Sequence, residues 1–355
     1  MTTPALHIIS LPHTSTTWEY SWCAYSMKAL KLARMMDKLG YVVNLYASTE
    51  SDFKNTVPCV MAPPTAKVTE PEWSPKYFEA MNTKAIYEMQ KTIQPKDLIL
   101  LTTGWPQKLI ADAFPDNMAV EYGVGYEGTF SPFKVFESYA WMHTSYGYRG
   151  HGPGINSMNL QGSWYDCVIP NYFEIDQFPE GDGSGDYLLY IGRLIELKGV
   201  NIAVETAKRT GLRLVVAGQG TPPEGCQYKG VVGPEERSAL MGNARAVLVP
   251  SLYLEPFGGV CVESQICGTP VITTDWGAFP ETVEQGRTGF RCHTPAEFDA
   301  AVTDVLTLDR KYIRDRAISK YSTDAIAPLY DTYFKRLMDL YDGIGFNAVT
   351  RGSVQ

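Results

Sequence analysis

Cations, carboxylates and glycines gather in the second half of the chain, in an order that suits an anion. Arg193 and Lys198 follow a short apolar run, and a glycine directly after Lys198 can open a helix. Cations beside the start of a helix form an anion site, because the first turn exposes unpaired N–H groups and a positive partial charge. Further on, Glu255 and Glu263 lie eight positions apart and enclose a pair of glycines. These residues predict an anion-binding site beside two carboxylates.

Glycines mark two further places where a ligand could approach the backbone. Gly218 and Gly220 end a short apolar run. Phe257 precedes Gly258 and Gly259, which stand at the start of an expected helix. Because glycine has no Cβ, a ligand can come closer to the chain there. We expect backbone groups of both segments to contact the ligand.

Short apolar runs alternate with amphipathic helical segments along the whole chain. This alternation is typical of parallel sheets that are covered by helices on both faces. The expected strands lie at 6–10, 41–46, 97–102 and 118–122 in the first half, and at 187–191, 212–217, 246–250 and 270–273 in the second. The sequence therefore predicts an α/β protein with two domains of similar size.

The segment 170–186 separates the two series of strands. Its alternating glycines and two prolines break any regular element. We therefore place an N-terminal domain at 1–172 and a C-terminal domain at 173–355. The C-terminal domain includes a last helix at about 323–341, which carries an apolar stripe.

The composition of the 355-residue chain is that of an ordinary globular protein. Hydrophobic residues make up 45% and charged residues 20%, which excludes a mainly disordered, collagen-like or coiled-coil chain. No apolar run nears the roughly 20 residues that cross a bilayer, and the start lacks the features of a signal peptide. Seven scattered cysteines, none paired at a two-residue separation, indicate reduced thiols rather than disulfides or a zinc module. We expect a soluble, cytoplasmic protein without a metal site.

Five segments between residues 187 and 290 together resemble the donor domain of retaining GT-B glycosyltransferases, specifically family four. In order they are IGRLIELKG, AGQG, PSLYLEPFGGVCVESQICGTPVI, GAFPE and GRTGF. The preceding VIPNYFEIDQF is similar to the interdomain segment of that family. The resemblance implies two facing Rossmann-like domains with a cleft between them, and a C-terminal helix that crosses back to pack on the N-terminal domain.

The resemblance also implies a reaction: transfer of a hexose from a nucleotide-diphosphate sugar to an acceptor hydroxyl, with retention of configuration. UDP-glucose is the first candidate donor. Arg193 and Lys198 would stabilise the leaving diphosphate, together with the amides near Gly258. Glu255 would contact hydroxyls of the donor sugar, and Glu263 would hold the ribose. Since fixed cations and dipoles can stabilise the leaving charge, neither a metal nor another cofactor is expected beside the nucleotide sugar.

The N-terminal domain departs from the family pattern in its first loop, which usually carries a glycine pair. Here that loop is rich in hydroxyl residues and contains His13, a candidate for acceptor contact whose alternative is a surface histidine. Tyr126 and Glu127 follow an expected strand and are candidates to touch donor sugar or acceptor, unless they form a simple turn. His143 is a further cleft candidate, with a buried, hydrogen-bonded histidine as the alternative.

The first half also bears on the acceptor, because it holds six of the seven tryptophans and aromatic faces suit sugars and bases. Helix 19–39 places Lys28, Lys31, Arg34 and Lys38 at helical spacing. This is either a solvated face or a peripheral contact with an anionic membrane or nucleic acid. A glycan or glycolipid is the favoured acceptor, ahead of a hydroxymethylated base in viral DNA and a small molecule. The net charge of −8 opposes a polyanionic partner.

Two other functions fit the same fold. GT-B folds also serve nucleotide-sugar epimerases, and an inactive relative could act as a binding protein. The complete cation pair and glutamate pair favour an active transferase. No protein partner is evident.

Overall fold

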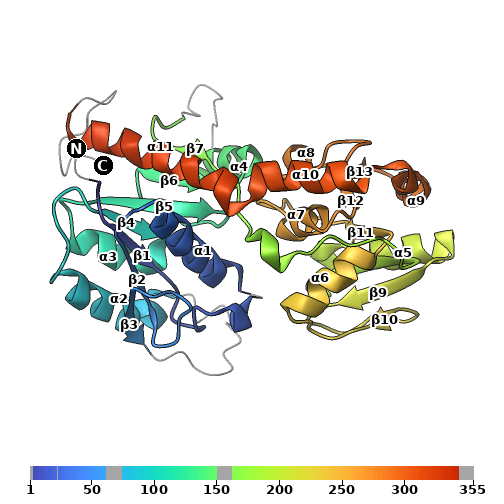
Figure 1. Cartoon of the computed structure of the whole chain (residues 1–355), viewed down its shortest axis with the longest axis horizontal. Coiled ribbons are helices and arrows are strands. Elements are labelled where there is room, and N and C mark those ends of the chain that lie inside the picture. The colour runs from blue at the N-terminus through green and yellow to red at the C-terminus, as the bar shows by residue number, and fades with distance from the viewer. Residues whose placement is uncertain (1–2, 22, 61–73, 150–161, 344–355) are drawn as a thin grey trace. The chain divides into compact units, whose positions relative to one another are not determined.

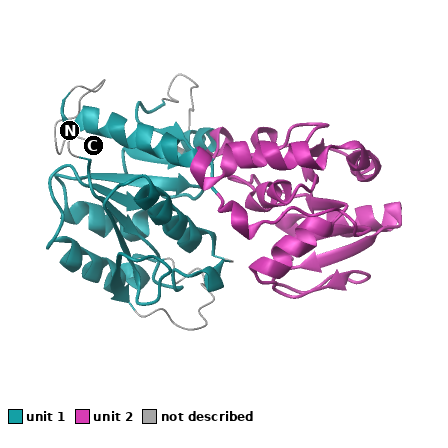
Figure 2. Ribbon diagram, in the orientation of Figure 1, with its two compact units in different colours: residues 1–137, 142–172, 326–355 teal, residues 138–141, 173–325 magenta. Residues whose placement is uncertain are grey.

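The computed structural model describes residues 3–21, 23–60, 74–149 and 162–343 (Figure 1). Two compact units divide the chain (Figure 2): unit 1 comprises residues 1–137, 142–172 and 326–355, and unit 2 comprises residues 138–141 and 173–325. The sequence placed one boundary at residue 172. In the structure the chain also changes unit near residues 138, 142 and 326, so the C-terminal segment belongs to unit 1.

Unit 1 has, within its described residues, a seven-stranded parallel sheet in the order β3-β2-β1-β4-β5-β6-β7. Its strands are β1 (Leu6–Ile9), β2 (Val43–Ser48), β3 (Thr56–Val60), β4 (Leu98–Leu101), β5 (Met118–Val124), β6 (Phe133–Phe136) and β7 (Cys167–Val168). Its helices are α1 (Ala24–Lys38), α2 (Pro75–Met89), α3 (Lys108–Ala113), most of α4 (Tyr139–Arg149) and most of α11 (Thr323–Tyr341).

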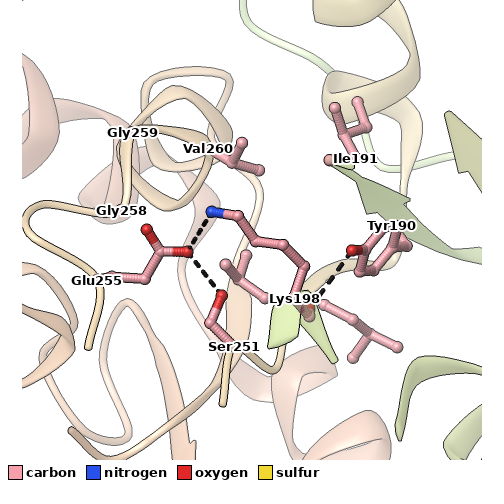
Figure 3. Close-up of a pocket in the computed structure, with 11 residues that line it drawn as sticks. Tyr190, Ile191, Lys198, Ser251, Glu255, Gly258, Gly259 and Val260 are labelled. Atoms are coloured by element: carbon pink, nitrogen blue, oxygen red, sulfur yellow. Dashed lines mark hydrogen bonds and ion pairs between the residues drawn. The ribbon is translucent and has the colours of Figure 1, made fainter. Parts of the chain in front are cut away.

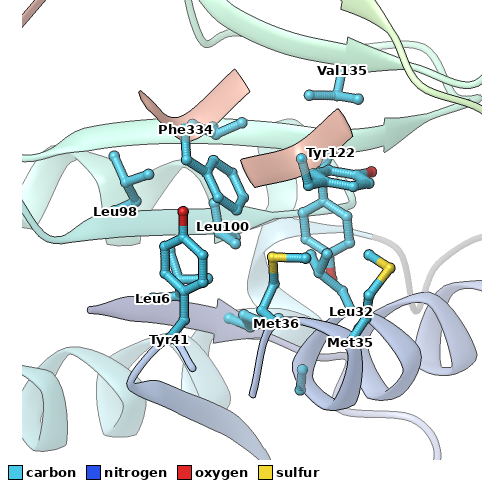
Figure 4. Packing of buried hydrophobic residues seen from close by; sticks show 14 of the residues in the cluster. Leu6, Leu32, Met35, Met36, Tyr41, Leu98, Leu100, Tyr122, Val135 and Phe334 are labelled. Carbon is cyan, nitrogen blue, oxygen red and sulfur yellow. The ribbon is translucent and has the colours of Figure 1, made fainter. Parts of the chain in front are cut away.

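Helices cover both faces of this sheet, because successive strand side chains point to opposite sides. Leu6 and Ile8 of β1 join a core with α1 and α11, whereas Ile9 joins a second core with α2 and α3. Figure 4 shows the first core, in which Phe334 of α11 lies near Tyr41. Their ring centroids are 6.0 Å apart. The last helix of the chain therefore covers one face of the sheet that contains the first strand, β1.

Unit 2 repeats the same architecture with six strands among its described residues, in the order β10-β9-β8-β11-β12-β13. The strands are β8 (Tyr187–Ile191), β9 (Arg213–Ala217), β10 (Gln227–Tyr228), β11 (Ala246–Val249), β12 (Val271–Thr274) and β13 (Gly289–Cys292). The helices are α5 (Val200–Thr210), α6 (Pro234–Asn243), α7 (Gly259–Ile266), α8 (Phe279–Thr282), α9 (Pro295–Asp304) and α10 (Arg310–Tyr321). The predicted α/β class and the parallel sheets are confirmed. No helix in the described ranges is both long and apolar enough to cross a bilayer.

The basic side chains of α1 do not form the single solvated stripe that their spacing indicated. Lys28 is only 6% exposed. It forms an ion pair with Glu137 and donates to the Gly123 carbonyl oxygen at 3.0 Å. Lys31 donates to the Tyr172 carbonyl oxygen at 2.7 Å. Helical spacing could not separate these internal contacts from solvation, because their partners come from distant parts of the chain. Only part of the expected anion-facing surface is thus left exposed on α1.

Candidate functional site

The first site segment is the turn that joins β8 to α5 in unit 2. Arg193 is exposed there, and the side chain of Lys198 is 21% exposed. Gly199 adopts the left-handed conformation (φ 72°), and a Cβ at this position would collide with the Pro250 carbonyl oxygen. Glycine is therefore required for the turn to pack against the segment after β11, which carries the first glutamate.

Lys198 and Glu255 form the centre of a pocket in unit 2 (Figure 3). The Lys198 Nζ lies 2.7 Å from Glu255 Oε1, and Ser251 donates to the same oxygen at 2.6 Å. The Tyr253 hydroxyl donates to Glu255 Oε2 and accepts from Lys198 Nζ, both at 2.6 Å. The carboxylate is thus held by three side chains. Sequence reasoning brought Lys198 and Glu255 together but missed Ser251 and Tyr253.

The start of α7 provides the backbone side of this pocket. Gly258 is the residue before the helix and has a φ of 78°, where a Cβ would press against the Phe279 ring. Gly258 and Gly259 line the pocket together with Lys198 and Glu255. The positive end of α7 therefore adds to the lysine charge. Phe257 is only 3% exposed, packs in the core of unit 2 and is not among the residues that line the pocket. Its contact with a ligand stays a prediction.

The fold itself requires glycine at positions 218 and 220, whether or not a ligand approaches there. Both adopt positive φ angles, 139° and 133°. A Cβ at Gly218 would collide with the Gly192 carbonyl oxygen, and one at Gly220 would crowd the Leu194 Cβ at 2.7 Å. These glycines let the loop after β9 lie against the loop after β8, which carries Arg193. Their contact with a ligand stays a prediction.

Glu263 lies on α7 and forms an ion pair with Arg237 of α6. The exposed fractions of the two side chains are 12% and 21%. Sequence analysis did not single out Arg237, because the two residues are 26 positions apart and no local spacing connects them. This ion pair joins the side chains of α6 and α7.

The candidates in unit 1 occupy different environments. His13 is buried, with its Nε2 3.3 Å from the Cys23 Sγ, so the surface-histidine alternative was wrong. Tyr126 is half-buried and its ring lies 6.1 Å from Tyr25, whereas Glu127 is exposed. His143 is exposed, so the alternative of a buried histidine was wrong for it. Their contact with an acceptor stays a prediction.

Burial lowers the pKa of His13 to about 4, since the imidazolium would lose its hydration. The unfolded chain, with a histidine pKa near 6.5, therefore binds a proton between pH 6.5 and 4 that the folded chain does not. The stability contributed by neutral His13 is complete above pH 6.5 and falls as the pH drops towards 4.

The free energy of unfolding should therefore decrease between pH 7 and pH 5, and we expect this decrease to be about 2 kcal/mol smaller in His13→Gln than in the wild type. Urea unfolding at both pH values measures this. His7, whose pKa burial also lowers, is present in both proteins, and an unchanged pH dependence would contradict the assignment to His13.

The two parallel sheets with their helices are those of GT-B proteins. AviGT4, described as a glycosyltransferase involved in avilamycin A biosynthesis, has a TM-score of 0.69 at 19% identity and covers 94% of this chain and 98% of its own. Sucrose-phosphate synthase from Thermosynechococcus elongatus has a TM-score of 0.70 at 17% identity, with 94% and 99% covered. Anabaena HepE, solved with UDP and glucose, has a TM-score of 0.67 at 14% identity, with 94% and 99% covered. At these identities the likeness establishes the fold.

The sequence comparisons concern the part of the chain that forms unit 2. Residues 172–324 match the family model for glycosyl transferases group 1. Glycogen synthase of Mycobacterium tuberculosis (strain H37Rv) is 35% identical over 139 residues, which are 34% of this chain and 33% of that protein. D-inositol 3-phosphate glycosyltransferase of Mycobacterium avium is 37% identical over 154 residues, or 35% and 36%. The matches span about a third of the length of these relatives. The match over residues 172–324 confirms the predicted resemblance of this part of the chain to glycosyl transferases group 1.

Proposed function

We propose that this protein is a retaining glycosyltransferase that moves a hexose from a nucleotide-diphosphate sugar to an acceptor hydroxyl. The observation that carries the proposal is the Lys198–Glu255 pair beside the start of α7, which offers cationic charge and a fixed carboxylate within one pocket. A nucleotide sugar needs both, because its phosphates are anionic and its hydroxyls are neutral donors. UDP-glucose is the first candidate donor, since HepE was solved with UDP-glucose.

In the proposed reaction the bond between the anomeric carbon and the diphosphate oxygen breaks, and a bond to the acceptor oxygen forms on the same face. The acceptor proton passes to the departing diphosphate. Lys198, the exposed Arg193 and the amides at Gly258 and Gly259 stabilise the charge that grows on the leaving group. Glu255 orients the sugar through a hydroxyl. We propose that these fixed charges serve where other transferases employ a divalent ion.

The acceptor that we propose first is a glycan or glycolipid. One matched relative is named for glycogen and another for an inositol phosphate, so acceptors rich in hydroxyl groups occur among the relatives. A hydroxymethylated DNA base is the second proposal, and the net charge of −8 weighs against it. The exposed Arg34 and Lys38 of α1 remain the basis for peripheral contact with an anionic surface. We also propose that the protein acts in the cytoplasm.

A thermal-shift panel of UDP, GDP, ADP and their common sugar conjugates tests the donor assignment. A ligand at 100 times its Kd stabilises the native state by about 2.7 kcal/mol. That corresponds to a rise in Tm of roughly 5 to 10 °C for the unfolding of a domain of about 150 residues, the size of unit 2. We expect one nucleotide series to give this shift and Arg193→Ala to reduce it.

Arg213→Ala is the matched control, because Arg213 is also exposed but begins β9, at the opposite end of that strand from Gly218. It should shift like the wild type. The absence of a shift with every nucleotide would contradict the proposed donor site.

A further inference from the structure

Arg237 stands at a place on α6 that helix stability does not explain. Helix α6 begins at Pro234, and the Arg237 amide donates to the Gly233 carbonyl oxygen at 2.9 Å, so Arg237 closes the first turn. The start of a helix favours anions, as the neighbouring Glu235 and Glu236 satisfy. A cation at this end of the helix is unfavourable unless another contact compensates for it.

The hydrogen bonding of Arg237 also indicates that this residue is not placed there for stability. Its Nε is buried and has no hydrogen-bond partner in the described part of the chain. Leaving a buried donor unpaired opposes folding, and a partly exposed ion pair adds little stability in return. The interaction that remains is the ion pair from its terminal nitrogen to Glu263 Oε2. Holding that carboxylate is therefore what Arg237 contributes.

Glu263 is the carboxylate that the resemblance to family four assigns to the ribose of the donor, and we carry this assignment into the proposed function. An ionised carboxylate has about four acceptor positions on its two oxygens. Arg237 approaches Oε2 and holds the carboxylate in one direction. Such fixing matters for recognition, because a hydrogen bond weakens quickly when its angle departs from linear.

We propose that Arg237 is a positioning residue for ribose recognition, which acts by holding Glu263 towards a ribose hydroxyl. This inference rests on the proposed function, because it requires a nucleotide at this site. It predicts that the protein distinguishes ribonucleotides from deoxynucleotides and that Arg237 sets the size of the difference.

The test compares the affinities of UDP, 2′-deoxy-UDP and 3′-deoxy-UDP by calorimetry, with the matched GDP or ADP series where the panel selects that base. We expect the wild type to bind the ribonucleotide about tenfold more tightly than one of the two deoxy analogues. In Arg237→Met the affinity for the ribonucleotide should fall about tenfold while that for this analogue changes little, so that the ratio approaches one. Arg237→Lys keeps the charge and should recover part of the ratio.

Three comparisons separate positioning from a structural role. In Glu263→Gln the ratio of the affinities for the ribonucleotide and the deoxy analogue should also approach one. Adding Arg237→Met to Glu263→Gln should not change this ratio further, as expected for two residues that act through one interaction. Arg245→Met is the matched control, because Arg245 pairs with Asp186 in the same unit and outside the pocket; it should keep the wild-type ratio. The Tm of each protein without ligand reports folding.

The outcomes also separate this inference from the proposed function. If the wild type binds none of the nucleotides, the proposed function fails and the inference fails with it. If the wild type binds a nucleotide but discriminates against neither deoxy analogue, the role of Glu263 is wrong and Arg237 has nothing to position. If Glu263→Gln loses the ratio while folded Arg237→Met and Arg237→Lys keep it, the inference alone is overturned.

Discussion

Lys198→Met is expected to lower the rate of sugar transfer by about 100- to 1000-fold, the range found when one preorganised donor of a transition-state site is removed. Its Nζ lies 2.7 Å from Glu255 Oε1 and 2.6 Å from the Tyr253 hydroxyl, so its charge is fixed before a donor binds. Methionine keeps much of the side-chain volume and removes only the charge and the hydrogen bonds. Glu255→Gln should give a loss of similar size, because the amide is a weaker acceptor for the sugar hydroxyl. Steady-state kinetics with the donor that the thermal-shift panel selects measures both effects.

Stability must be separated from activity in this experiment, because the pair is largely buried. The side chains of Lys198 and Glu255 are 21% and 8% exposed, and removing one partner of a buried pair leaves the other charge uncompensated. The double variant Lys198→Met with Glu255→Gln removes both charges together. We expect it to unfold at nearly the wild-type temperature and to remain inactive. Near-normal turnover in the folded single variants would contradict the assignment of this pair to the site.

The parts of the site that could be predicted are those that local spacing connects to an element. Lys198 follows a strand and precedes a helix start, and Glu255 precedes another helix start. Parallel topology then brings the two segments together, since the ends of adjacent strands β8 and β11 meet at one edge of the sheet. Glycines at these turns could be found for the same reason, because only glycine tolerates both the positive φ and the close backbone.

The parts that could not be predicted are the partners. Tyr253 is two residues from Glu255, yet successive residues of a loop have no fixed direction, and nothing in the sequence shows that its hydroxyl bridges the lysine and the glutamate. Lys28 had the spacing of a solvated stripe, but its carboxylate partner is Glu137, directly after β6. Arg237 and Glu263 likewise meet across two helices. Side-chain pairing across distant segments is a property of the packed fold, and single-sequence periodicity does not contain it.

Phe334→Ala is the substitution for which we expect the largest loss of stability. Phe334 is 1% exposed in the core of unit 1, with its ring centroid 5.8 Å from that of Tyr330 and 6.0 Å from that of Tyr41. Truncation of a buried phenylalanine costs about 3 to 5 kcal/mol, through lost burial and through the cavity that remains. Because a domain is stable by only about 5 to 15 kcal/mol, this is a large part of the total for unit 1.

Leu329→Ala is the matched control, because Leu329 lies on the same helix but is 45% exposed. Its loss should stay within about 0.5 kcal/mol, as for other surface substitutions. Urea unfolding with and without the bound nucleotide distinguishes the two units, since ligand binding to unit 2 stabilises only the state that binds it. One unfolding transition should move to lower urea concentration in Phe334→Ala, while the transition that responds to nucleotide stays unchanged. This result would show that α11 stabilises unit 1. Equal losses in Phe334→Ala and Leu329→Ala would instead mean that the helix contributes through its backbone and that the buried aromatic contacts are not what holds it on the sheet.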